Sequence, residues 1–409
     1  MPRAPIRQCA ILAGGMATRL GALAADTPKP ALEVGGRPFL FWLLRELSRF
    51  GIEEVVLLAG HLAAELEAIM RAAARELPRP MRLTVSTETI PAGTGGALRQ
   101  AASLLDAQFL LCNGDSLFDT NLAELLARRA ADDAATIGRL ALRALPDASR
   151  YGVIAREGER ITGFAERPAP GAPGIINAGI YALDRTILDR CAPNCSLERD
   201  VLPALAAEGA LAGAPSEGWF VDIGIPADLA RARAELPGRL RRNALFLDRD
   251  GVLNRDLGHV GSRARWEWMP GAQAAVRAAT ARGWHVFVVT NQSGVARGFY
   301  TEDDVRDLMV WAADSLRQAG GTIDDWRFCP YHPEAPLADY RRESGWRKPE
   351  PGMILDLIRA WTLDPAGCVL VGDQPSDLAA ARAAGIAAHL FSGGDLAEFV
   401  APLFDASPG

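Results

Sequence analysis

The positions of two lysines are the clearest indication of a chemical function in this sequence. The chain has 409 residues and 44 lysines plus arginines, of which only Lys29 and Lys348 are lysines, leaving 42 arginines. A proline follows each lysine, in DTPKP and in WRKPEP. An ammonium is a compact cation that fits a tight phosphate pocket better than the planar guanidinium of arginine. A GC-rich genome explains why lysine is rare but not where these two lie, and we predict that both bind phosphate.

The first lysine accompanies a glycine turn. The segment ILAGGMATRLGALAADTPKP runs from a strand-like stretch through two glycines to two cations, namely Gly14, Gly15, Arg19 and Lys29. Glycines allow backbone amides to approach phosphate oxygens closely, and nucleotides bind at the carboxyl ends of strands in doubly wound sheets. A Gly-Gly pair alone is as often a structural turn, but the pair together with both cations indicates a triphosphate site.

Two aspartates in the same half of the chain follow apolar, strand-like runs. Asp115 lies in LLCNGDS and Asp222 in WFVDIG, each in a turn that contains glycine. An aspartate in such a turn often serves only to form the turn or to cap a helix. Two carboxylates at strand ends are also suited to holding one Mg²⁺ ion together with phosphate oxygens.

The second lysine belongs to a group of polar residues at predicted strand ends. LFLDRDG places Asp248 and Asp250 two residues apart, so that both carboxylates share one face of extended backbone. An Asp-x-Asp-Gly sequence can be a structural turn, but three further segments accompany it. VVTNQSG, WRKP and LVGDQPSD supply Thr290, Asn291, Lys348, Asp373 and Asp377. Carboxylates, a lysine and a threonine together favour phosphate chemistry with a divalent metal.

The pattern of apolar residues predicts the elements that position these groups. Short apolar runs, such as CAILAGG and WHVFVVT, alternate with segments of helical periodicity, such as FLFWLLRELSRFG. This alternation is typical of α/β domains with mainly parallel sheets. The pattern is interrupted at ELPGRLRRN and then restarts. We therefore predict two doubly wound, three-layer α/β domains, over residues 1–236 and 243–409, with a linker at 237–242.

Composition narrows the class of protein. The net charge of −6 and the pI of about 5.6 argue against binding to nucleic acid. No apolar run reaches the roughly 18–20 residues that a membrane helix requires, and the N-terminus does not resemble a signal peptide. Six scattered cysteines fit free thiols in a reducing compartment. We expect a cytoplasmic enzyme that acts on small molecules.

The first half resembles the sugar-phosphate nucleotidyltransferases, most closely the heptose 1-phosphate guanylyltransferase group. The resemblance covers residues 1–236 and rests on ILAGGMATRL, GTGGAL, NGD, RYGVI, ERP, NAGIY and DIGIP. It implies in-line attack by a sugar 1-phosphate on the α-phosphorus of a nucleoside triphosphate, with release of pyrophosphate. Catalysis would consist mainly of positioning and charge neutralisation.

The resemblance also implies roles for particular residues. Arg19 and Lys29 would bind the triphosphate and stabilise the transition state, while Asp115 and Asp222 would bind Mg²⁺. The remaining implied contacts are Gly14, Gly15 and Thr18 to the triphosphate, Glu88, Gly93 and Thr94 to the base, and Glu166, Arg167 and Asn177 to the sugar phosphate. Ala17 replaces the family's third loop glycine, which costs about 1 kcal/mol if that position needs a positive φ. Because the neighbouring polar residues are intact, we expect activity to persist.

The second half resembles the haloacid dehalogenase-type phosphatases, in particular the heptose bisphosphate and histidinol phosphatase subgroup. The resemblance spans about 243–395 and implies that Asp248 is the nucleophile and Asp250 the general acid and then the base. The implied phosphate and substrate contacts are Thr290, Asn291, Arg347 and Lys348, and the implied Mg²⁺ site is formed by Asp248, Asp250 through its carbonyl, Asp373 and Asp377. The first two motifs are too close in sequence for a large cap domain.

The subgroup's zinc loop is not preserved in this sequence. Its Cys-x-His and Cys-x-Cys positions read Cys329, Tyr331, Ser344 and Trp346, and His332 is one residue out of register. One thiol and one displaced histidine do not make a tetrahedral zinc site. We expect no zinc, and a loop held by packing around Tyr331 and Trp346.

Together the two resemblances predict a bifunctional enzyme of nucleotide-activated heptose synthesis. Removal of the 7-phosphate from D-glycero-D-manno-heptose 1,7-bisphosphate would yield heptose 1-phosphate, which nucleotidyl transfer, with GTP favoured, would then activate. Three alternatives remain open: another sugar such as mannose 1-phosphate, another nucleotide, or one domain that is degenerate and regulatory. A homo-oligomer is compatible with the sequence.

Overall fold

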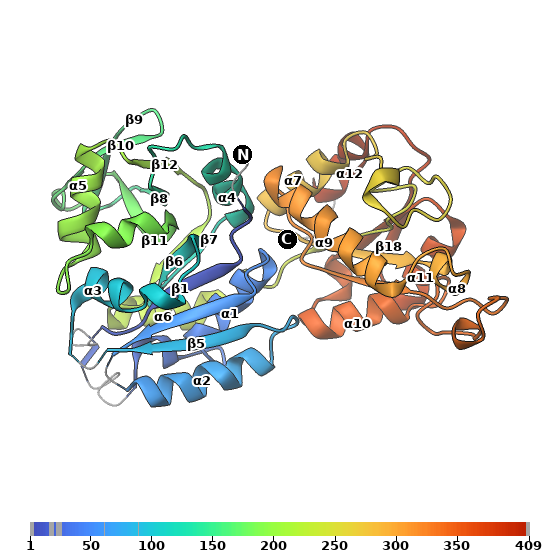
Figure 1. Cartoon of the computed structure of the whole chain (residues 1–409), viewed down its shortest axis with the longest axis horizontal. Helices are drawn as coiled ribbons and strands as arrows, with labels where there is room; N and C mark the ends of the chain where they lie inside the picture. The colour runs from blue at the N-terminus through green and yellow to red at the C-terminus, as the bar shows by residue number, and fades with distance from the viewer. Residues whose placement is uncertain (1–3, 16–19, 22–26, 61, 89, 406–409) are drawn as a thin grey trace. The chain divides into compact units, whose positions relative to one another are not determined.

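The computed structural model describes residues 4–15, 20–21, 27–60, 62–88 and 90–405. The chain forms two compact units, Met1–Arg239 and Leu240–Gly409 (Figure 1). Thr18, Arg19 and Ala17, which the sequence places in the triphosphate loop, lie outside the described residues.

A nine-stranded sheet forms the centre of the first unit. Its order is β5 (Arg82–Thr87), β4 (Glu54–Ala59), β1 (Gln8–Leu12), β6 (Gln108–Asn113), β11 (Gly174–Asp184), β8 (Gly138–Leu145), β12 (Leu211–Pro215), β10 (Arg160–Ala165) and β9 (Val153–Glu157). The first four strands are parallel, whereas β11 runs antiparallel to both β6 and β8. The sheet is therefore doubly wound at its N-terminal end and mixed beyond β6.

Helices and two small ribbons complete this unit. The helices are α1 (Phe39–Arg49), α2 (Ala63–Arg75), α3 (Gly93–Gln100), α4 (Leu122–Ala131), α5 (Leu202–Ala207) and α6 (Pro226–Arg239). The ribbons pair β2 (Glu33–Val34) with β3 (Arg37–Pro38), and β7 (Ser116–Asp119) with β13 (Trp219–Asp222). Short turns η2 (Lys29–Ala31), η3 (Ala102–Leu104), η4 (Arg185–Arg190) and η5 (Leu197–Val201) lie between them. Helix α6 extends through 237–239, residues that the sequence pattern places in the linker.

A five-stranded parallel sheet forms the second unit. Its order is β16 (Asp325–Cys329), β15 (His285–Asn291), β14 (Ala244–Leu247), β17 (Cys368–Gly372) and β18 (Ala387–Leu390). The helices are α7 (Ala272–Ala281), α8 (Ser293–Ala296), α9 (Glu302–Gln318), α10 (Gly352–Trp361), α11 (Pro375–Ala384) and α12 (Leu396–Asp405), with turns η6 (Arg263–Arg265), η7 (Ala338–Tyr340) and η8 (Pro365–Gly367). Between β14 and β15 the only helical elements are η6 and α7.

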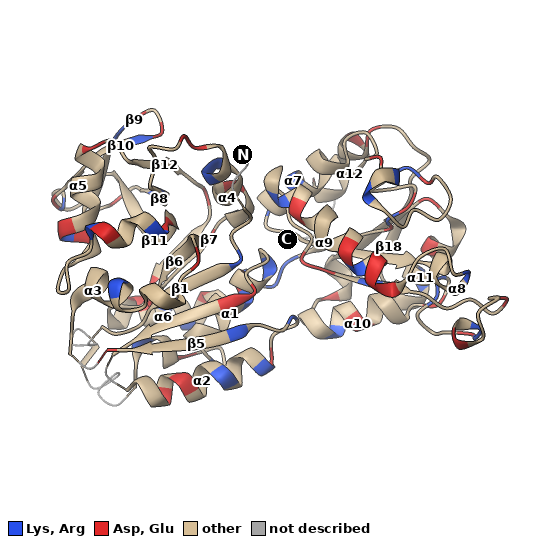
Figure 2. Ribbon diagram, viewed as in Figure 1, with Lys and Arg blue, Asp and Glu red and all other residues tan. Residues whose placement is uncertain are grey.

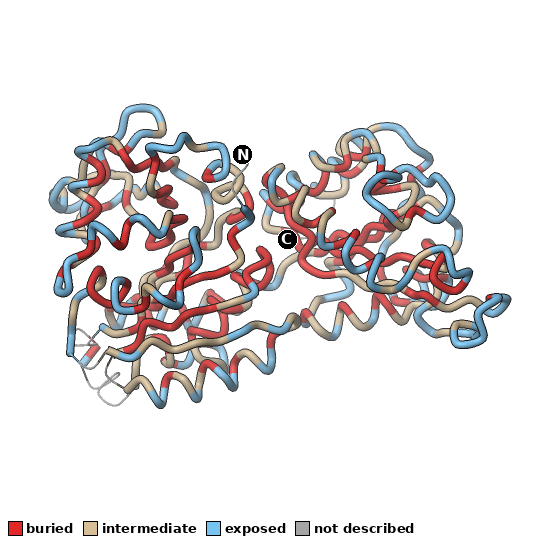
Figure 3. The backbone as a smooth tube through the Cα atoms, viewed as in Figure 1, coloured by how far each residue is buried: buried red, intermediate tan, exposed pale blue. Residues whose placement is uncertain are grey.

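Alternate residues of the central strand β14 pack into two different cores. Leu245 and Leu247 belong to one cluster of buried side chains, and Ala244 and Phe246 to the other. Successive side chains of a strand point to opposite faces, so both faces of this sheet are covered by helices. Figure 3 shows the buried strands and the half-exposed helices that cover them. The predicted doubly wound α/β class is confirmed.

The surface elements carry both signs of charge. Figure 2 shows acidic and basic residues spread along the elements of each unit. No helix among the described residues is long and apolar enough to cross a membrane. All six cysteines are buried free thiols.

Candidate active sites

The first unit contains a cavity of about 960 Å³ near the carboxyl ends of β1 and β6. Seven residues singled out in the sequence line it, namely Gly14, Gly15, Lys29, Glu88, Gly93, Thr94 and Asp115. The structure thus brings together glycines, a cation and carboxylates from segments up to a hundred residues apart. This location agrees with the rule that ligands of α/β sheets bind at the carboxyl ends of strands.

Lys29 and Asp115 form an ion pair on the wall of this cavity. The Lys29 Nζ atom lies 2.9 Å from Asp115 Oδ2, and the two side chains are 13% and 28% exposed. Gly114 precedes the aspartate at a point where a Cβ would lie 2.6 Å from the Leu12 carbonyl, so the turn after β6 can pack closely on β1 only with glycine. The strand end and the glycine together aim Asp115 at the cavity.

Asp222 does not line the cavity, but the β7–β13 ribbon holds it next to Asp115. It is the register partner of Ser116, and the Ile223 amide donates to the Asp115 carbonyl at 2.9 Å. The ribbon therefore fixes the two aspartates beside each other although they are far apart in the sequence. Two carboxylates on neighbouring backbone segments, one of which lines the cavity, suit Mg²⁺, which prefers few protein carboxylates plus phosphates.

Glu88 offers the cavity an unused acceptor. Its Oε2 atom lies 3.0 Å and 3.4 Å from the positions that Cβ atoms on Gly14 and Gly60 would take, so both glycines leave room for it. Its Oε1 atom is buried and has no hydrogen-bond partner within the part of the chain that the structure describes. Burial raises the pKa of Glu88, against the opposing effect of the Ala92 backbone. A buried acceptor without a hydrogen bond costs folding free energy. That cost is removed when a bound ligand donates a hydrogen bond to it.

The GTGG segment begins helix α3 beneath the cavity. Gly93 has φ of +72°, and a Cβ there would lie 2.5 Å from the Cys195 carbonyl, so that only glycine fits. The Thr94 hydroxyl donates to Glu198 Oε2 at 2.8 Å and accepts from the Leu197 amide at 2.8 Å. Glu198 also lines the cavity and was missed by the sequence interpretation, because a charged residue in SLERDVLP resembles an ordinary helix surface.

The residues expected to contact the sugar phosphate lie elsewhere. Glu166 and Arg167 follow β10 and are exposed, and Asn177 lies in β11. None of the three lines the cavity. Val153 of β9 is the register partner of both Ala165 and Ile176, so Glu166 and Asn177 flank the same end of β9. The Asn177 side chain donates to the Tyr181 hydroxyl at 2.7 Å.

The second unit has a buried cluster built around Lys348. The Lys348 Nζ atom lies 2.8 Å from Asp248 Oδ1 and 2.6 Å from Asp377 Oδ1, and donates to the Val289 carbonyl at 2.9 Å. The lysine side chain is only 3% exposed. Burial lowers its pKa, but the two carboxylates outweigh burial and the net shift is upward. Lys348 is therefore a fixed cation beside Asp248.

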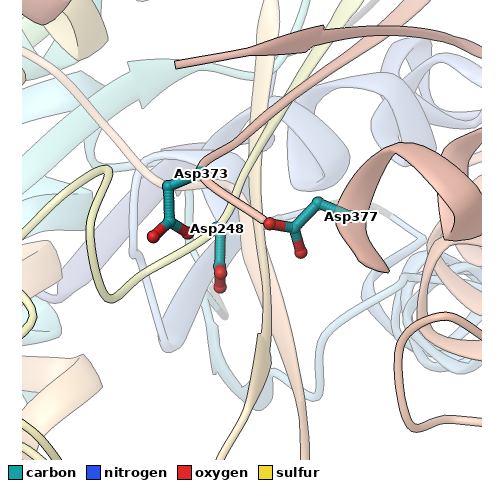
Figure 4. A group of neighbouring side chains, drawn as sticks. All are labelled: Asp248, Asp373 and Asp377. Carbon is teal, nitrogen blue, oxygen red and sulfur yellow. The ribbon is translucent and has the colours of Figure 1, made fainter. Parts of the chain in front are cut away.

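Three aspartates meet at the carboxyl ends of β14 and β17. Oxygen atoms of Asp248, Asp373 and Asp377 lie within 4.8 Å of one another (Figure 4). The Asp373 Oδ1 atom is buried and has no hydrogen-bond partner among the described residues. Burial raises the pKa of Asp248 and of Asp373. Three carboxylates against one ammonium leave this buried cluster short of positive charge, and the donor set fits Mg²⁺.

Gly251 makes room for this cluster. It has φ of +84°, and a Cβ there would lie 2.4 Å from Asp373 Oδ2. A side chain at this position would both strain the backbone and displace the carboxylate. This geometry explains why the LDRDG segment has glycine at this position.

The Asp250 carboxylate lies outside that group of three and is held by other side chains. Arg249 donates to both of its oxygens, with Nη2 2.8 Å from Oδ2, while Asn254 donates to Oδ1 and Gln292 to Oδ2, each at 2.9 Å. Its side chain is 20% exposed. The structure thus does not bring the carboxylate of Asp250 into the candidate metal group, and only its backbone carbonyl remains as the ligand that the resemblance implies.

Strand β15 and the WRKP segment complete the site. Thr290 is buried at the end of β15, and its hydroxyl accepts from Gln292 at 2.9 Å. The Asn291 side chain donates to the Lys348 carbonyl and accepts from its amide, both at 3.0 Å, which fixes the lysine backbone. Arg347 is half-buried and donates to the Tyr331 carbonyl at 3.3 Å.

The loop that replaces the zinc site is held by aromatic packing. The Tyr331 ring lies 5.9 Å from that of Tyr340, and the Arg342 guanidinium lies 3.7 Å from the Tyr331 ring centre. Trp346 is 38% exposed, so it contributes less than expected to holding the loop. Among the described residues, the three aspartates are the group of three or more His, Cys, Asp and Glu side chains that lie close enough together to hold a metal.

Comparison with known proteins assigns each half of the chain to a protein family. A family model described as nucleotidyl transferase matches residues 9–238, and a model described as HAD-hydrolase-like matches residues 345–398. D-glycero-beta-D-manno-heptose-1,7-bisphosphate 7-phosphatase of Rhodopseudomonas palustris is 52% identical over 160 residues, which are 39% of this chain and 89% of that protein. The alpha-anomer 7-phosphatase of Burkholderia mallei is 43% identical over 151 residues, 37% of this chain and 80% of that protein.

One further relative and one solved structure each match about half of the chain. The catalytic subunit beta of mannose-1-phosphate guanylyltransferase from Dictyostelium discoideum is 32% identical over 223 residues, which are 53% of this chain and 61% of that protein. The crystal structure of HddC from Yersinia pseudotuberculosis is 27% identical, covers 56% of this chain and 100% of its own, and has a TM-score of 0.49.

Proposed function

We propose substrates for this chain, which belongs to the nucleotidyl transferase family and carries a second, HAD-like phosphatase domain. Its phosphatase domain removes the 7-phosphate of D-glycero-D-manno-heptose 1,7-bisphosphate. Its nucleotidyltransferase domain then joins heptose 1-phosphate to GMP from GTP and releases pyrophosphate. The observation that carries the proposal is the buried Asp248–Lys348–Asp377 arrangement in a chain that is 52% identical, over 160 of its residues, to a heptose bisphosphate 7-phosphatase.

The phosphatase step uses two carboxylates in sequence. An oxygen of Asp248 attacks phosphorus, the bond from phosphorus to the sugar oxygen breaks, and Asp250 protonates the leaving oxygen. Asp250 then accepts a proton from the water that hydrolyses the aspartyl-phosphate. Lys348 and Thr290 hold the phosphate oxygens. Asp248, Asp373 and the carbonyl of Asp250 would hold Mg²⁺, with Asp377 supporting Lys348, and the ion would supply further positive charge.

A second cationic group beside this site supports a bisphosphate substrate. Arg347 is half-buried, while Arg297 is exposed. Burial lowers the pKa of Arg347, and the neighbouring charge of Arg297 lowers it further. An arginine guanidinium can bind a phosphate through two of its nitrogens. The phosphate that is not hydrolysed would bind there.

The nucleotidyl transfer step depends on positioning. An oxygen of the sugar 1-phosphate attacks the α-phosphorus of the nucleotide as the bond to pyrophosphate breaks. Lys29 neutralises charge on the phosphates, and Glu88 accepts hydrogen bonds from the base. Asp115 and Asp222 would hold Mg²⁺, which supplies charge neutralisation when bound.

A coupled assay tests the proposal. Purified protein is supplied with each anomer of the heptose bisphosphate and with each of the four nucleoside triphosphates, and phosphate and pyrophosphate are measured separately. We expect both products, with GTP giving the fastest pyrophosphate release. Turnover with mannose 1-phosphate and not heptose 1-phosphate would favour the other sugar. Loss of only one activity would indicate that one domain is degenerate.

Glu88→Gln tests how the base is read. Guanine presents N1–H and N2–H donors together, and a carboxylate can accept both, whereas a glutamine would oppose one of them with its own donor. We expect kcat/KM for GTP to fall by roughly 10- to 100-fold, the size of one or two hydrogen bonds to a charged group. The measurement is steady-state kinetics with GTP and ATP, with phosphate release as an internal control. An equal loss for both nucleotides would show that Glu88 does not read guanine.

A further inference from the structure

We infer that Tyr300 is a positioning residue for the phosphatase reaction, and that it acts through Gln292 to hold Asp250 in place for proton transfer. The inference rests on the proposed function of the second domain. Tyr300 does not itself contact the candidate metal group, and neither Tyr300 nor Gln292 belongs to the residues that the sequence motifs singled out.

A chain of hydrogen bonds connects the two residues. The Tyr300 hydroxyl donates to Gln292 Oε1 at 2.8 Å. The Nε2 atom of the same amide donates to Asp250 Oδ2 and to the Thr290 hydroxyl, both at 2.9 Å. Gln292 is 1% exposed. One buried amide thus contacts the proposed general acid on one side and a proposed phosphate-binding residue on the other.

The amide can serve Asp250 only in one orientation. In the ionised state, in which it is ready to take a proton from water, the Asp250 carboxylate only accepts hydrogen bonds, so Nε2 must face Asp250 and Oε1 must face Tyr300. Without the tyrosine hydroxyl, the buried Oε1 atom of Gln292 would lose its hydrogen-bond donor. The free-energy cost of that unsatisfied acceptor would disfavour this orientation of the amide. Tyr300 therefore selects the amide orientation that supports Asp250.

Tyr300 is itself fixed by close packing. A Cβ on Gly261 would lie 2.1 Å from the Tyr300 ring, and a Cβ on Gly294 would lie 2.3 Å from the hydroxyl oxygen. The two glycines form a slot for the ring, and a larger side chain at either position would displace it. Burial raises the pKa of Tyr300 to about 12, so the hydroxyl keeps the proton that it donates.

Other side chains support Asp250 from different directions, which limits the expected effect. Arg249 and Asn254 also donate to its carboxylate. Removing the Tyr300 hydroxyl should make the position of the Asp250 carboxylate less well defined, while its other hydrogen bonds remain. Proton transfer depends steeply on geometry and contributes about 10²- to 10⁴-fold to such reactions, so part of that factor should be lost.

The test compares Tyr300→Phe with the wild-type enzyme on two phosphate monoesters. A sugar phosphate has a poor leaving group that requires a proton from Asp250, whereas p-nitrophenyl phosphate has a good leaving group that does not. We expect kcat/KM, which reports the steps up to release of the leaving group and not the later hydrolysis of the aspartyl-phosphate, to fall about tenfold for the sugar phosphate and to stay within about twofold for p-nitrophenyl phosphate. A merely structural role would lower both rates equally.

Three further variants keep the test decisive. Tyr340→Phe removes a tyrosine hydroxyl that bonds to Glu302 in the same unit and should leave both rates unchanged. Gln292→Met should reproduce the selective loss, and adding Tyr300→Phe to it should cause little further loss if Tyr300 acts through Gln292. Full additivity, or equal losses on both substrates, would overturn the inference. A wild-type enzyme that hydrolyses neither monoester would overturn the proposed function and this inference with it.

Discussion

Asp248→Asn is expected to abolish phosphate release and to leave pyrophosphate release unchanged. Asparagine has the shape of aspartate, but its amide cannot form the acyl-phosphate that the mechanism requires. The side chain is 11% exposed and lies 2.8 Å from Lys348, so no nearby carboxylate can take its place without moving. We expect kcat for phosphate release to fall by more than about 1,000-fold. Phosphate and pyrophosphate are measured on the same preparation.

The control for this prediction is Asp303→Asn. Asp303 lies in the first turn of α9, and its side chain is 88% exposed. The same change of charge at that surface should leave both activities unaffected, because exposed ion pairs contribute little. Thermal unfolding of both variants shows whether Asp248→Asn still folds. Phosphate release that persists in a folded Asp248→Asn protein would rule out Asp248 as the nucleophile.

The sequence was sufficient to predict the residues at strand ends. Asp248 and Asp373 follow two parallel strands and Thr290 lies at the end of a third, and parallel strands bring their carboxyl ends to one edge of the sheet. The same reasoning identified Asp115 as a carboxylate at the end of a strand. Apolar periodicity identifies such strands, so the side chains that follow them can be located without knowledge of packing.

Other parts of the sites depend on contacts that periodicity does not encode. Glu198 reaches the first cavity only because Thr94 of α3 packs on the turn that carries it. The Asp250 carboxylate turns toward Arg249 and Gln292 and away from the other aspartates, a choice of rotamer. The mixed part of the first sheet was likewise not visible in the alternation of elements, because antiparallel strands such as β11 have the same apolar runs.

The two lysines differ in how tightly the protein holds them. Lys348 has three oxygen acceptors within 2.9 Å and is almost fully buried. Lys29 lies in η2 between Pro28 and Pro30 and is 13% exposed, and its ammonium pairs with Asp115 among the residues that the structure describes. The less constrained lysine is better placed to move onto a ligand, so its substitution is the more specific test of phosphate binding.

Lys29→Arg is therefore expected to reduce nucleotidyl transfer by roughly 100-fold and to leave phosphate release unchanged. The guanidinium is planar and would bind the Asp115 carboxylate through two nitrogens, which holds that carboxylate away from Mg²⁺ and the guanidinium away from the phosphates. The charge is conserved, so any loss reflects shape and not net charge. The measurement is kcat for pyrophosphate release at saturating substrates.

Lys348→Arg supplies the reciprocal control, since it changes the same chemical group in the other domain. It should reduce only phosphate release, because a guanidinium cannot satisfy Asp248, Asp377 and the Val289 carbonyl in the space that the ammonium occupies. If both variants kept near-normal rates, the positions of the two lysines would reflect only the base composition of the genome. If each lost a different activity, the two residues that a lysine-poor chain retained would mark one phosphate site in each domain.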